Sequence, residues 1–180
     1  MNNRKTPASM LRSVLAAVAA SLAAVLLLSA AWTYSQDAAS PPQSLKVAPQ
    51  VTLAGFIDQV PAEQLRESNT LVIDLRTAEE GTADEQTRLT QAGVSYANIP
   101  MGRAPLSSTQ IADFEALLAE HPDQPVLIHC ASGNRAGLLW AVHMINQGTD
   151  VEDAIQHVSL IANREPVHQA IRDYALTKAQ

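Results

Sequence analysis

The stretch VLIHCASGNRAGLLW, Val126–Trp140, decides the fold. Val126–His129 is a short, mostly apolar run of the kind that forms a buried strand. After a turn that contains Gly133, residues 135–146 follow the apolar spacing of a helix. A buried strand that leads directly into a helix indicates an α/β fold.

Strands and helices alternate on either side of this stretch. Short apolar runs predict three further strands, of which the first is expected at an edge of the sheet. Helical spacing, capping residues and glycine stops predict the helices. The sequence therefore predicts a central, mostly parallel sheet of about four strands flanked by helices. Strands are expected at residues 51–57, 71–75 and 94–99, and helices after Pro61, at 82–91, after Ser108, from Asp150 to about Ile161, and at 165–178.

The N-terminal segment has the pattern of a membrane-directed leader. Three basic residues precede an uncharged stretch that ends at Asp37, and residues 14–31 contain only two serines as polar residues. As a helix these residues would span about 27 Å, close to the roughly 30 Å of a bilayer's hydrocarbon core. We predict that residues 1–31 form a signal peptide or an uncleaved anchor, a hydrophobic helix with its N-terminus in the cytoplasm. The rest would be exported to the periplasm, soluble or tethered to the inner membrane by residues 13–31.

The remainder of the chain divides into a linker and one domain. Residues 32–50 are rich in Pro, Ser, Gln and Ala, which is typical of a flexible linker. Residues 51–180 are enough for a single hydrophobic core.

Charge and cysteine content limit the function classes. The chain has 12 Lys and Arg against 18 Asp and Glu, and a formal charge of -6. Three of the basic residues lie in the leader, so the remainder carries nine against eighteen, a formal charge of -9. This balance excludes an ordinary nucleic-acid binder and requires any anion site to be made locally. The one cysteine excludes an internal disulfide and a zinc site built on several thiolates.

Cys130 lies where the central strand ends and the next helix begins. The turn after it presents backbone N–H groups, and the N-terminus of the helix adds a partial positive charge, so the segment can cradle an anion. Gly133 permits a backbone angle that other residues resist. Arg135 could bind two oxygens of an oxyanion, and all these features favour the thiolate form of Cys130. The candidate anion-binding loop is Ala131, Ser132, Gly133 and Asn134.

The same run resembles the active-site segment of the cysteine-dependent phosphatase superfamily, which includes the protein tyrosine and dual-specificity phosphatases. It is most similar to small bacterial phosphatase-like domains that also occur fused to β-lactamase-fold hydrolases. The resemblance extends over about residues 50–165, through LVIDLRTAEE at 71–80, AGVSYANIPM at 92–101 and GTDVEDAI at 148–155.

The resemblance implies a three-layer phosphatase-type fold and a chemistry. Cys130 would attack phosphorus to form a phosphocysteine, and Arg135 with the loop amides would bind the phosphoryl oxygens before water completes hydrolysis. His129 would support the loop. The substrate would be a small anion, and neither a metal nor another cofactor is required.

Three departures from the family pattern keep two alternatives open. Four residues rather than five separate Cys130 from Arg135, Ala136 stands where Ser or Thr is typical, and no carboxylate occurs between Glu85 and Asp113. The spacing Cys-x-x-Gly-x-Arg matches the rhodanese loop, in which the cysteine carries a persulfide, so a sulfurtransferase acting on a sulfane-sulfur donor is the first alternative. A non-catalytic anion-binding or interaction domain of the cell envelope is the second.

Other polar residues have two interpretations each. Arg76 follows a strand at the same sheet edge and could add a second cation, or could form a surface ion pair with Glu79 or Glu80. Arg103 could face the substrate or be a solvated loop residue. Asp74 is expected to bind neighbouring backbone amides. The remaining histidines show no spacing of metal ligands and are interpreted as structural or surface residues; they are His121, His143, His157 and His168.

Overall fold

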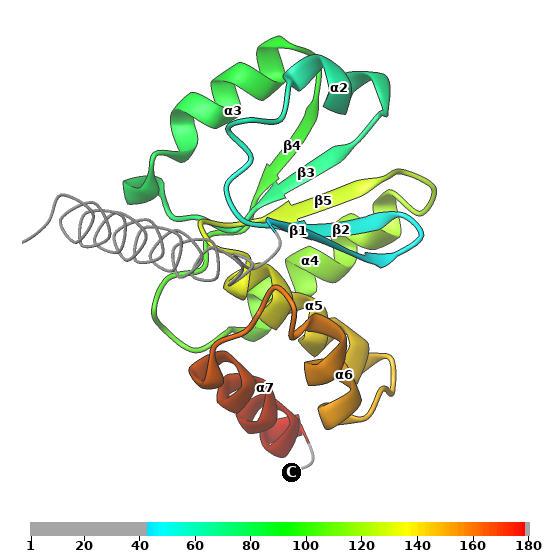
Figure 1. Ribbon diagram of the computed structural model, residues 1–180, viewed down its shortest axis with the longest axis vertical. Coiled ribbons are helices and arrows are strands. Elements are labelled where there is room, and N and C mark those ends of the chain that lie inside the picture. Colours follow the sequence, from blue (N-terminus) through cyan, green and yellow to red (C-terminus); the bar gives the residue numbers. More distant parts are fainter. Residues whose placement is uncertain (1–42, 179–180) are drawn as a thin grey trace, which may run out of the picture. The chain divides into compact units, whose positions relative to one another are not determined.

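The computed structural model describes residues 43–178, which form a mixed five-stranded sheet of order β1-β2-β5-β3-β4 (Figure 1). β1 pairs with β2 in the antiparallel sense, and the pairs β2–β5, β5–β3 and β3–β4 are parallel. The carboxyl ends of the four parallel strands therefore meet at one edge. The strands are β1 Ser44–Ala48, β2 Val51–Ala54, β3 Leu71–Asp74, β4 Ser95–Asn98 and β5 Val126–His129.

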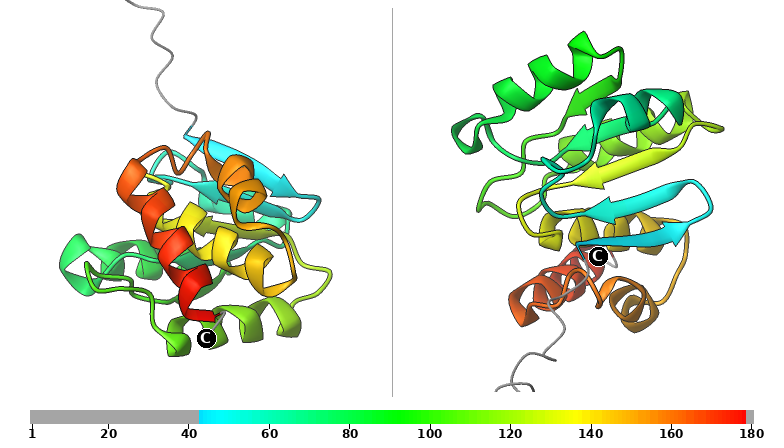
Figure 2. Two further views of the ribbon diagram at one scale, coloured as in Figure 1. Left: turned by 90° about the horizontal axis from the view of Figure 1, so that it is seen from below. Right: turned by 45° about the horizontal axis from the view of Figure 1, so that its top comes forward.

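Helices cover the two faces of this sheet in three layers, as the resemblance noted above predicts (Figure 1). α2 and α3 lie on one face, and α4 and α5 lie on the other, where α5, α6 and α7 pack against one another (Figure 2). A short 3-10 helix, η1, follows β3. The helices are α2 Ala62–Glu67, η1 Ala78–Glu80, α3 Thr82–Gln91, α4 Ser108–Glu120, α5 Asn134–Asn146, α6 Val151–Val158 and α7 Glu165–Lys178.

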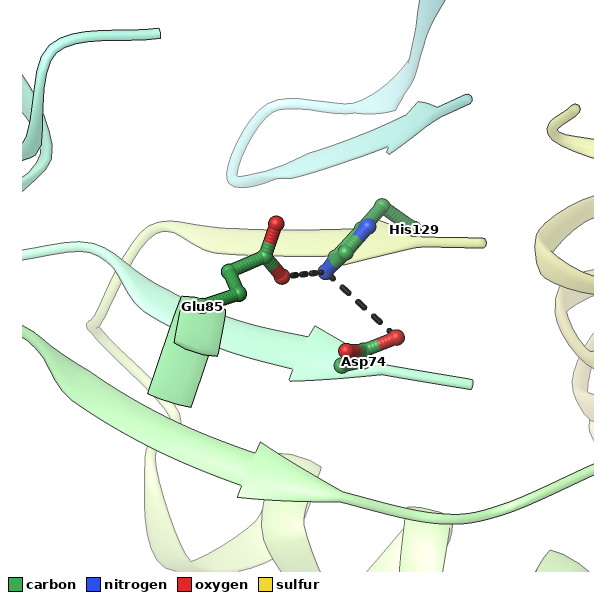
Figure 3. Close-up of side chains that lie close together, drawn as sticks. All are labelled: Asp74, Glu85 and His129. Carbon is green, nitrogen blue, oxygen red and sulfur yellow. Dashed lines mark ion pairs between the residues drawn. The ribbon is translucent and has the colours of Figure 1, made fainter. Parts of the chain in front are cut away.

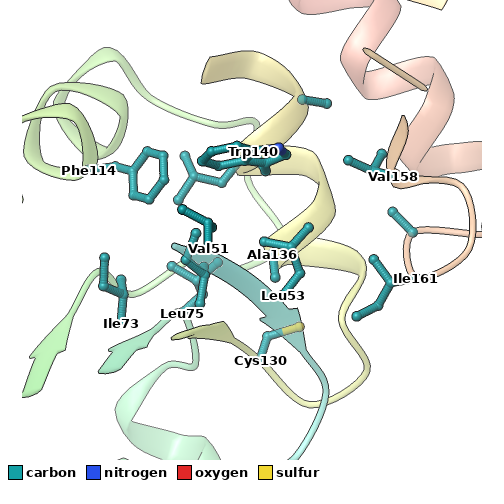
Figure 4. Packing of buried hydrophobic residues seen from close by; sticks show 14 of the residues in the cluster. Val51, Leu53, Ile73, Leu75, Phe114, Cys130, Ala136, Trp140, Val158 and Ile161 are labelled. Carbon is teal, nitrogen blue, oxygen red and sulfur yellow. The ribbon is translucent and has the colours of Figure 1, made fainter. Parts of the chain in front are cut away.

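Each face of the sheet has its own hydrophobic core because side chains alternate along a strand. Ile128 of β5 and Cys130, which comes just after β5, belong to the larger core on the α5 side. Cys130 lies there near Leu53 and Ile161 (Figure 4). Leu127 belongs to the smaller core under α2 and α3. His129 is likewise on that side, since it contacts Glu85 of α3. Adjacent residues of β5 therefore point to opposite faces of the sheet.

The structure confirms the predicted α/β order and corrects its N-terminal part. Residues 44–48, assigned from composition to the linker 32–50, form β1, and β2 is therefore an interior strand rather than the edge. Prolines and polar residues on both sides obscured this short strand, whose Leu45 and Val47 pack against the larger core. The last predicted helix before β5 is capped by Ser107, one residue earlier than expected.

The predictions for residues 1–42 lie outside the described residues. Within residues 43–178, no helix is both long and apolar enough to span a membrane. The leader at 1–31 and the export it implies therefore stay predictions.

The close approach of α5 to the chain after α6 depends on glycine. A Cβ added at Gly137 would lie 2.3 Å from the Cβ of Ala162 and 3.5 Å from that of Val158. Real Cβ atoms do not approach so closely, so a side chain here would push α5 away from the segment that packs beside the Cys130 loop.

Gly137→Val is expected to lower the free energy of unfolding by about 2–3 kcal/mol, because overpacking forces the backbone apart. Urea unfolding at neutral pH measures the change. Gly102→Val is the matched control, since a Cβ at Gly102 meets nothing within 4 Å, and it should stay within about 0.5 kcal/mol of the wild type. Equal unfolding midpoints for the two variants would contradict the packing argument.

Candidate functional site

Cys130 begins a loop at the carboxyl edge of the sheet, where ligands bind in open α/β folds. Its backbone N–H donates to the carbonyl of Ala54 at the end of β2 (3.3 Å). Two residues later, Ser132 forms an isolated antiparallel bridge with Gly55. These contacts hold the loop against the sheet, and the side chain of Cys130 is only 1% exposed. The thiol therefore lies at the base of the loop.

The loop turns around the sulfur. The backbone N–H of Gly133 donates to Cys130 Sγ at 3.1 Å, and Gly133 has the left-handed angle φ of 83° expected for it. A Cβ there would lie 2.3 Å from Cγ1 of Ile161. Asn134 begins α5, so the positive end of the helix dipole faces the loop. The side chain of Asn134 donates to Ser132 Oγ (3.1 Å), which links two residues of the loop.

Arg135 is held by a carboxylate that the sequence did not assign to the site. Its Nη1 donates to Glu80 Oε2 at 2.7 Å and its Nη2 to Glu80 Oε1 at 2.6 Å. Nη1 also donates to the carbonyls of Met101 (2.8 Å) and Leu75 (3.3 Å). The ion pair lowers the pKa of Glu80 to about 2. It also raises the pKa of Arg135, because the hydrogen bonds and the charge of Glu80 stabilise the guanidinium.

A local sequence pattern marks Glu80 as a capping residue, but no local pattern indicates its pairing with Arg135. Thr77 and Glu80 form a capping box at η1, in which the backbone N–H of Thr77 donates to Glu80 Oε2 (2.9 Å). The pattern T-x-x-E predicts such a cap. The pairing with Arg135 spans 55 residues of chain, so no local pattern indicated it.

Arg76 lies in a buried ion-pair network. It is neither a second cation for the loop nor part of a surface ion pair, which are the two interpretations that the sequence allowed. Its side chain donates to both carboxylate oxygens of Asp74 at 2.9–3.2 Å, and its Nη2 lies 2.7 Å from Glu85 Oε1. The ring of Phe56 covers the guanidinium, with Cζ 5.6 Å from the ring centroid. At 3% exposure, Arg76 forms no surface pair with Glu79 or Glu80 and offers no free second cation to the loop.

Asp74 accepts the bonds that the sequence predicted and one more. Its Oδ1 accepts from the backbone N–H of Arg76 at 2.9 Å, as expected for a carboxylate that binds nearby amides. Its Oδ2 accepts from the hydroxyl of Tyr96 at 2.9 Å. The pKa of Asp74 is lowered, because these bonds and the nearby charges outweigh the effect of burial, which is the largest single influence and acts upward.

His129 completes the network from below the loop. Its Nε2 lies 2.9 Å from Glu85 Oε1 and 3.7 Å from Asp74 Oδ1 (Figure 3). Because His129 points to the face opposite Cys130, it can support the strand end but does not face the sulfur. Glu85 was not singled out from the sequence, although it shares a face of α3 with the buried Leu89.

The network offers three ligand types that a metal could use. Atoms of Asp74, Glu85 and His129 lie within 4.8 Å of one another. The guanidinium of Arg76, however, already contacts both carboxylates at 2.9 and 2.7 Å. A divalent cation would have to sit beside this buried positive charge. Among the described residues, this cluster is therefore better explained as an ion-pair network than as a metal centre.

Comparison with known proteins agrees with this architecture. Residues 37–149 match the family model described as beta-lactamase hydrolase-like protein, phosphatase-like domain. No curated protein matches the chain.

Solved structures with the same fold are phosphatases or phosphatase candidates. A DUF442 phosphatase candidate from Shewanella putrefaciens CN-32 has a TM-score of 0.62 at 20% identity, covering 77% of this chain and 89% of that one. The phosphatase candidate nma1982 from Neisseria meningitidis Z2491 has 0.59 at 22%, covering 72% and 96%. TpbA from P. aeruginosa, solved in complex with pTyr, has 0.59 at 19%, covering 80% and 95%. At these identities the likeness establishes the fold.

Glu80→Gln is expected to destabilise the protein at pH 7 by about 0.5–1 kcal/mol, a value appropriate to a partly exposed ion pair. Because folding lowers the pKa of Glu80 from 4.5 to about 2, the stabilisation is present above about pH 4.5 and is lost as the pH falls towards 2. The difference between wild type and variant should therefore shrink on acidification. Urea unfolding at pH 7, 4 and 3 measures it.

The control for this prediction is Glu63→Gln, an exposed carboxylate in the first turn of α2. It should change the stability little at each pH. A Glu80→Gln difference that stays constant from pH 7 to pH 3 would show that the ion pair with Arg135 does not set the acid stability.

Proposed function

This chain belongs to the family of phosphatase-like domains of beta-lactamase hydrolase-like proteins, and from that premise we propose that it is an exported cysteine-dependent phosphatase. In this proposal Cys130 is the nucleophile and Arg135 binds the oxyanion. The observation that carries it is the position of the Cys130 sulfur, which lies at the N-terminus of α5 within hydrogen-bond distance of a loop amide. Gly133 N lies 3.1 Å from Cys130 Sγ, and the guanidinium of Arg135, in the first turn of α5, is fixed by Glu80 and by the Met101 carbonyl.

The proposed reaction has two displacements. The thiolate of Cys130 attacks phosphorus, the bond to the leaving oxygen breaks, and a phosphocysteine forms. The backbone amides from Ala131 to Arg135 and the guanidinium of Arg135 bind the phosphoryl oxygens as charge develops on them. Water then attacks phosphorus and releases phosphate and the thiolate. Glu80 and the Met101 carbonyl act as positioning groups, because their hydrogen bonds fix the guanidinium.

The proposed setting of the enzyme rests on its charge and leader. A formal charge of -9 after the leader disfavours nucleic acid as a partner, so the small anionic substrate that we propose must be bound by local groups. The apolar segment at 14–31 supports a periplasmic domain that is soluble or held at the inner membrane.

Sulfur transfer is a second candidate because the loop is short. Four residues separate Cys130 from Arg135, and Ile161 packs directly against Gly133. A short loop packed from outside suits a smaller group than a phosphoryl, such as the sulfane sulfur of a Cys130 persulfide. Transfer of sulfur also needs no acid to protonate an alkoxide.

We expect the full chain to hydrolyse p-nitrophenyl phosphate slowly, with release of p-nitrophenolate as the readout. Cys130→Ser should reduce the rate to background, because the hydroxyl is a much weaker nucleophile. Arg135→Ala should lower kcat/KM by on the order of 10²–10³, the usual effect of removing an oxyanion donor. Arg172→Ala is the matched control, since Arg172 also forms a two-point ion pair, with Glu152, on α7, and it should keep full activity.

The same preparation tests the two alternatives. Thiosulfate with cyanide as acceptor should give thiocyanate only at background level. Efficient Cys130-dependent thiocyanate formation without phosphate release would replace the proposed phosphatase by a sulfurtransferase. Silence in both assays, from a folded protein whose Cys130 reacts with iodoacetamide, would favour the non-catalytic binding domain.

A further inference from the structure

A groove lies on the face of the sheet opposite the Cys130 sulfur. Its volume is about 680 Å³, which is in the range of ligand sites in proteins. Residues of β1, β2 and β5 form its floor, and residues of α2 and of the segment that leads into α2 form its wall. The groove shares no residue with the loop Cys130–Arg135, so it is separate from the candidate active site.

Strand pairing places polar side chains on the floor of the groove. Lys46 of β1 is in register with Thr52 of β2, and Thr52 is in register with Leu127 of β5. Neighbours in register point to the same face of a sheet, and Leu127 belongs to the smaller core under α2 and α3. Within the described part of the chain, no helix covers β1 and β2 on this face (Figure 2). A ligand can therefore reach the floor from solvent.

The polar side chains of the groove are mostly neutral and are free to bind. Four glutamines line it, and their side-chain amides make no hydrogen bond to any residue of 43–178. The hydroxyl groups of Ser44 and Thr52 and the ammonium group of Lys46 also have no partner among these residues. No carboxylate lines the groove. Each glutamine amide can both donate and accept hydrogen bonds; the four residues are Gln43, Gln50, Gln59 and Gln64.

An exposed aromatic ring lies at one end of the groove, at the carboxyl edge of the sheet. Phe56 follows the last residue of β2 by two positions, lines the groove and is 51% exposed. The guanidinium of Arg76 lies over its ring, with Cζ 5.6 Å from the centroid. This contact holds the ring in place, while half of the side chain stays open to a ligand.

The length of the groove indicates an elongated ligand. Its lining residues extend from Gln50, just before β2, to Ala54 at the end of that strand. Five residues of extended chain span about 13–16 Å. The ligand is therefore expected to be a short chain of units rather than a single small molecule.

The chemistry of the lining selects among such chains. A strong anion would find only one cation, Lys46, for a charge-assisted contact. A peptide that binds by strand addition needs an open strand edge, but β2 in the floor is already paired with β1 and β5. Sugar rings carry hydroxyl groups that both donate and accept, and apolar C–H faces that can stack on an aromatic ring. We infer that the groove binds a neutral oligosaccharide, at a site distinct from the phosphatase site proposed at Cys130.

NMR titration of the full chain, in micelles of a detergent without sugar groups, tests this inference. The neutral probes are chitotetraose and maltotetraose. We expect at least one of them to bind at millimolar concentration and to shift the side-chain amide signals of the groove glutamines, because those amides contact the sugar.

Substitutions locate the binding site. Gln64→Ala should weaken binding of the probe about threefold to tenfold, the usual effect of losing one neutral hydrogen bond. Phe56→Leu should also weaken it, because leucine still covers Arg76 but provides no ring for stacking. Gln91→Ala is the matched control. Gln91 is an exposed glutamine at the end of α3 that does not line the groove, so this variant should bind as the wild type does.

Three further outcomes decide between ligand classes. Lys46→Gln should leave the affinity unchanged, because the ligand is neutral; loss of binding, or a preference for a heparin tetrasaccharide, would reveal an anion site and overturn the inference. A preference for a neutral Ser-Ala hexapeptide would replace the oligosaccharide by a peptide. The inference is also wrong if the folded full chain binds neither neutral probe, or if Gln64→Ala and Phe56→Leu bind as well as Gln91→Ala.

The test does not depend on the function proposed for Cys130. Cys130→Ser should bind the neutral probe with the affinity of the wild type, and Gln64→Ala should hydrolyse p-nitrophenyl phosphate at the wild-type rate. A protein that binds the sugar but releases no phosphate would keep this inference and remove only the proposed phosphatase.

Discussion

A buried arginine connects the elements that build the carboxyl edge of the sheet. Arg76 follows β3, and its guanidinium contacts Asp74 of β3 and Glu85 of α3, while Glu85 also contacts His129 of β5. Removing one member of such a network leaves an uncompensated buried charge, at a cost of about 3–5 kcal/mol. The network therefore fixes α3 and the ends of β3 and β5 relative to one another. The turn that carries Glu80 and the loop that begins at Cys130 both start from these fixed ends.

Arg76 and Arg135 have different roles because they lie on opposite sides of the sheet. Arg76 is held on the α3 side beneath Phe56, where carboxylates neutralise its charge. Arg135 approaches from α5, on the other side, and its guanidinium is held by Glu80 and by the Met101 carbonyl. The alternation of side chains along β5 produces the same division between His129 and Cys130. One face of the strand end supports the loop, and the other face presents the sulfur.

The short loop after Cys130 is in contact with the chain that follows α6. A Cβ added at Gly133 would lie 2.3 Å from Ile161 Cγ1, and one at Gly137 would lie 2.3 Å from the Cβ of Ala162. The segment that follows α6 thus packs against the loop from outside. The chain combines a phosphatase-type architecture with a loop of the length found in sulfurtransferases.

Local sequence patterns determined most of the fold and the centre of the site. Apolar runs of strand length, helical spacing and capping residues located the four parallel strands and the helices, because these signals depend only on near neighbours. Cys130, Gly133 and Arg135 stood out for the same reason. The tertiary structure decided which charges pair. Glu80 meets Arg135 across 55 residues, and β1 exists as a strand because β2 pairs with it. Such partners are chosen by contacts between distant segments, and no periodicity in the sequence records those contacts.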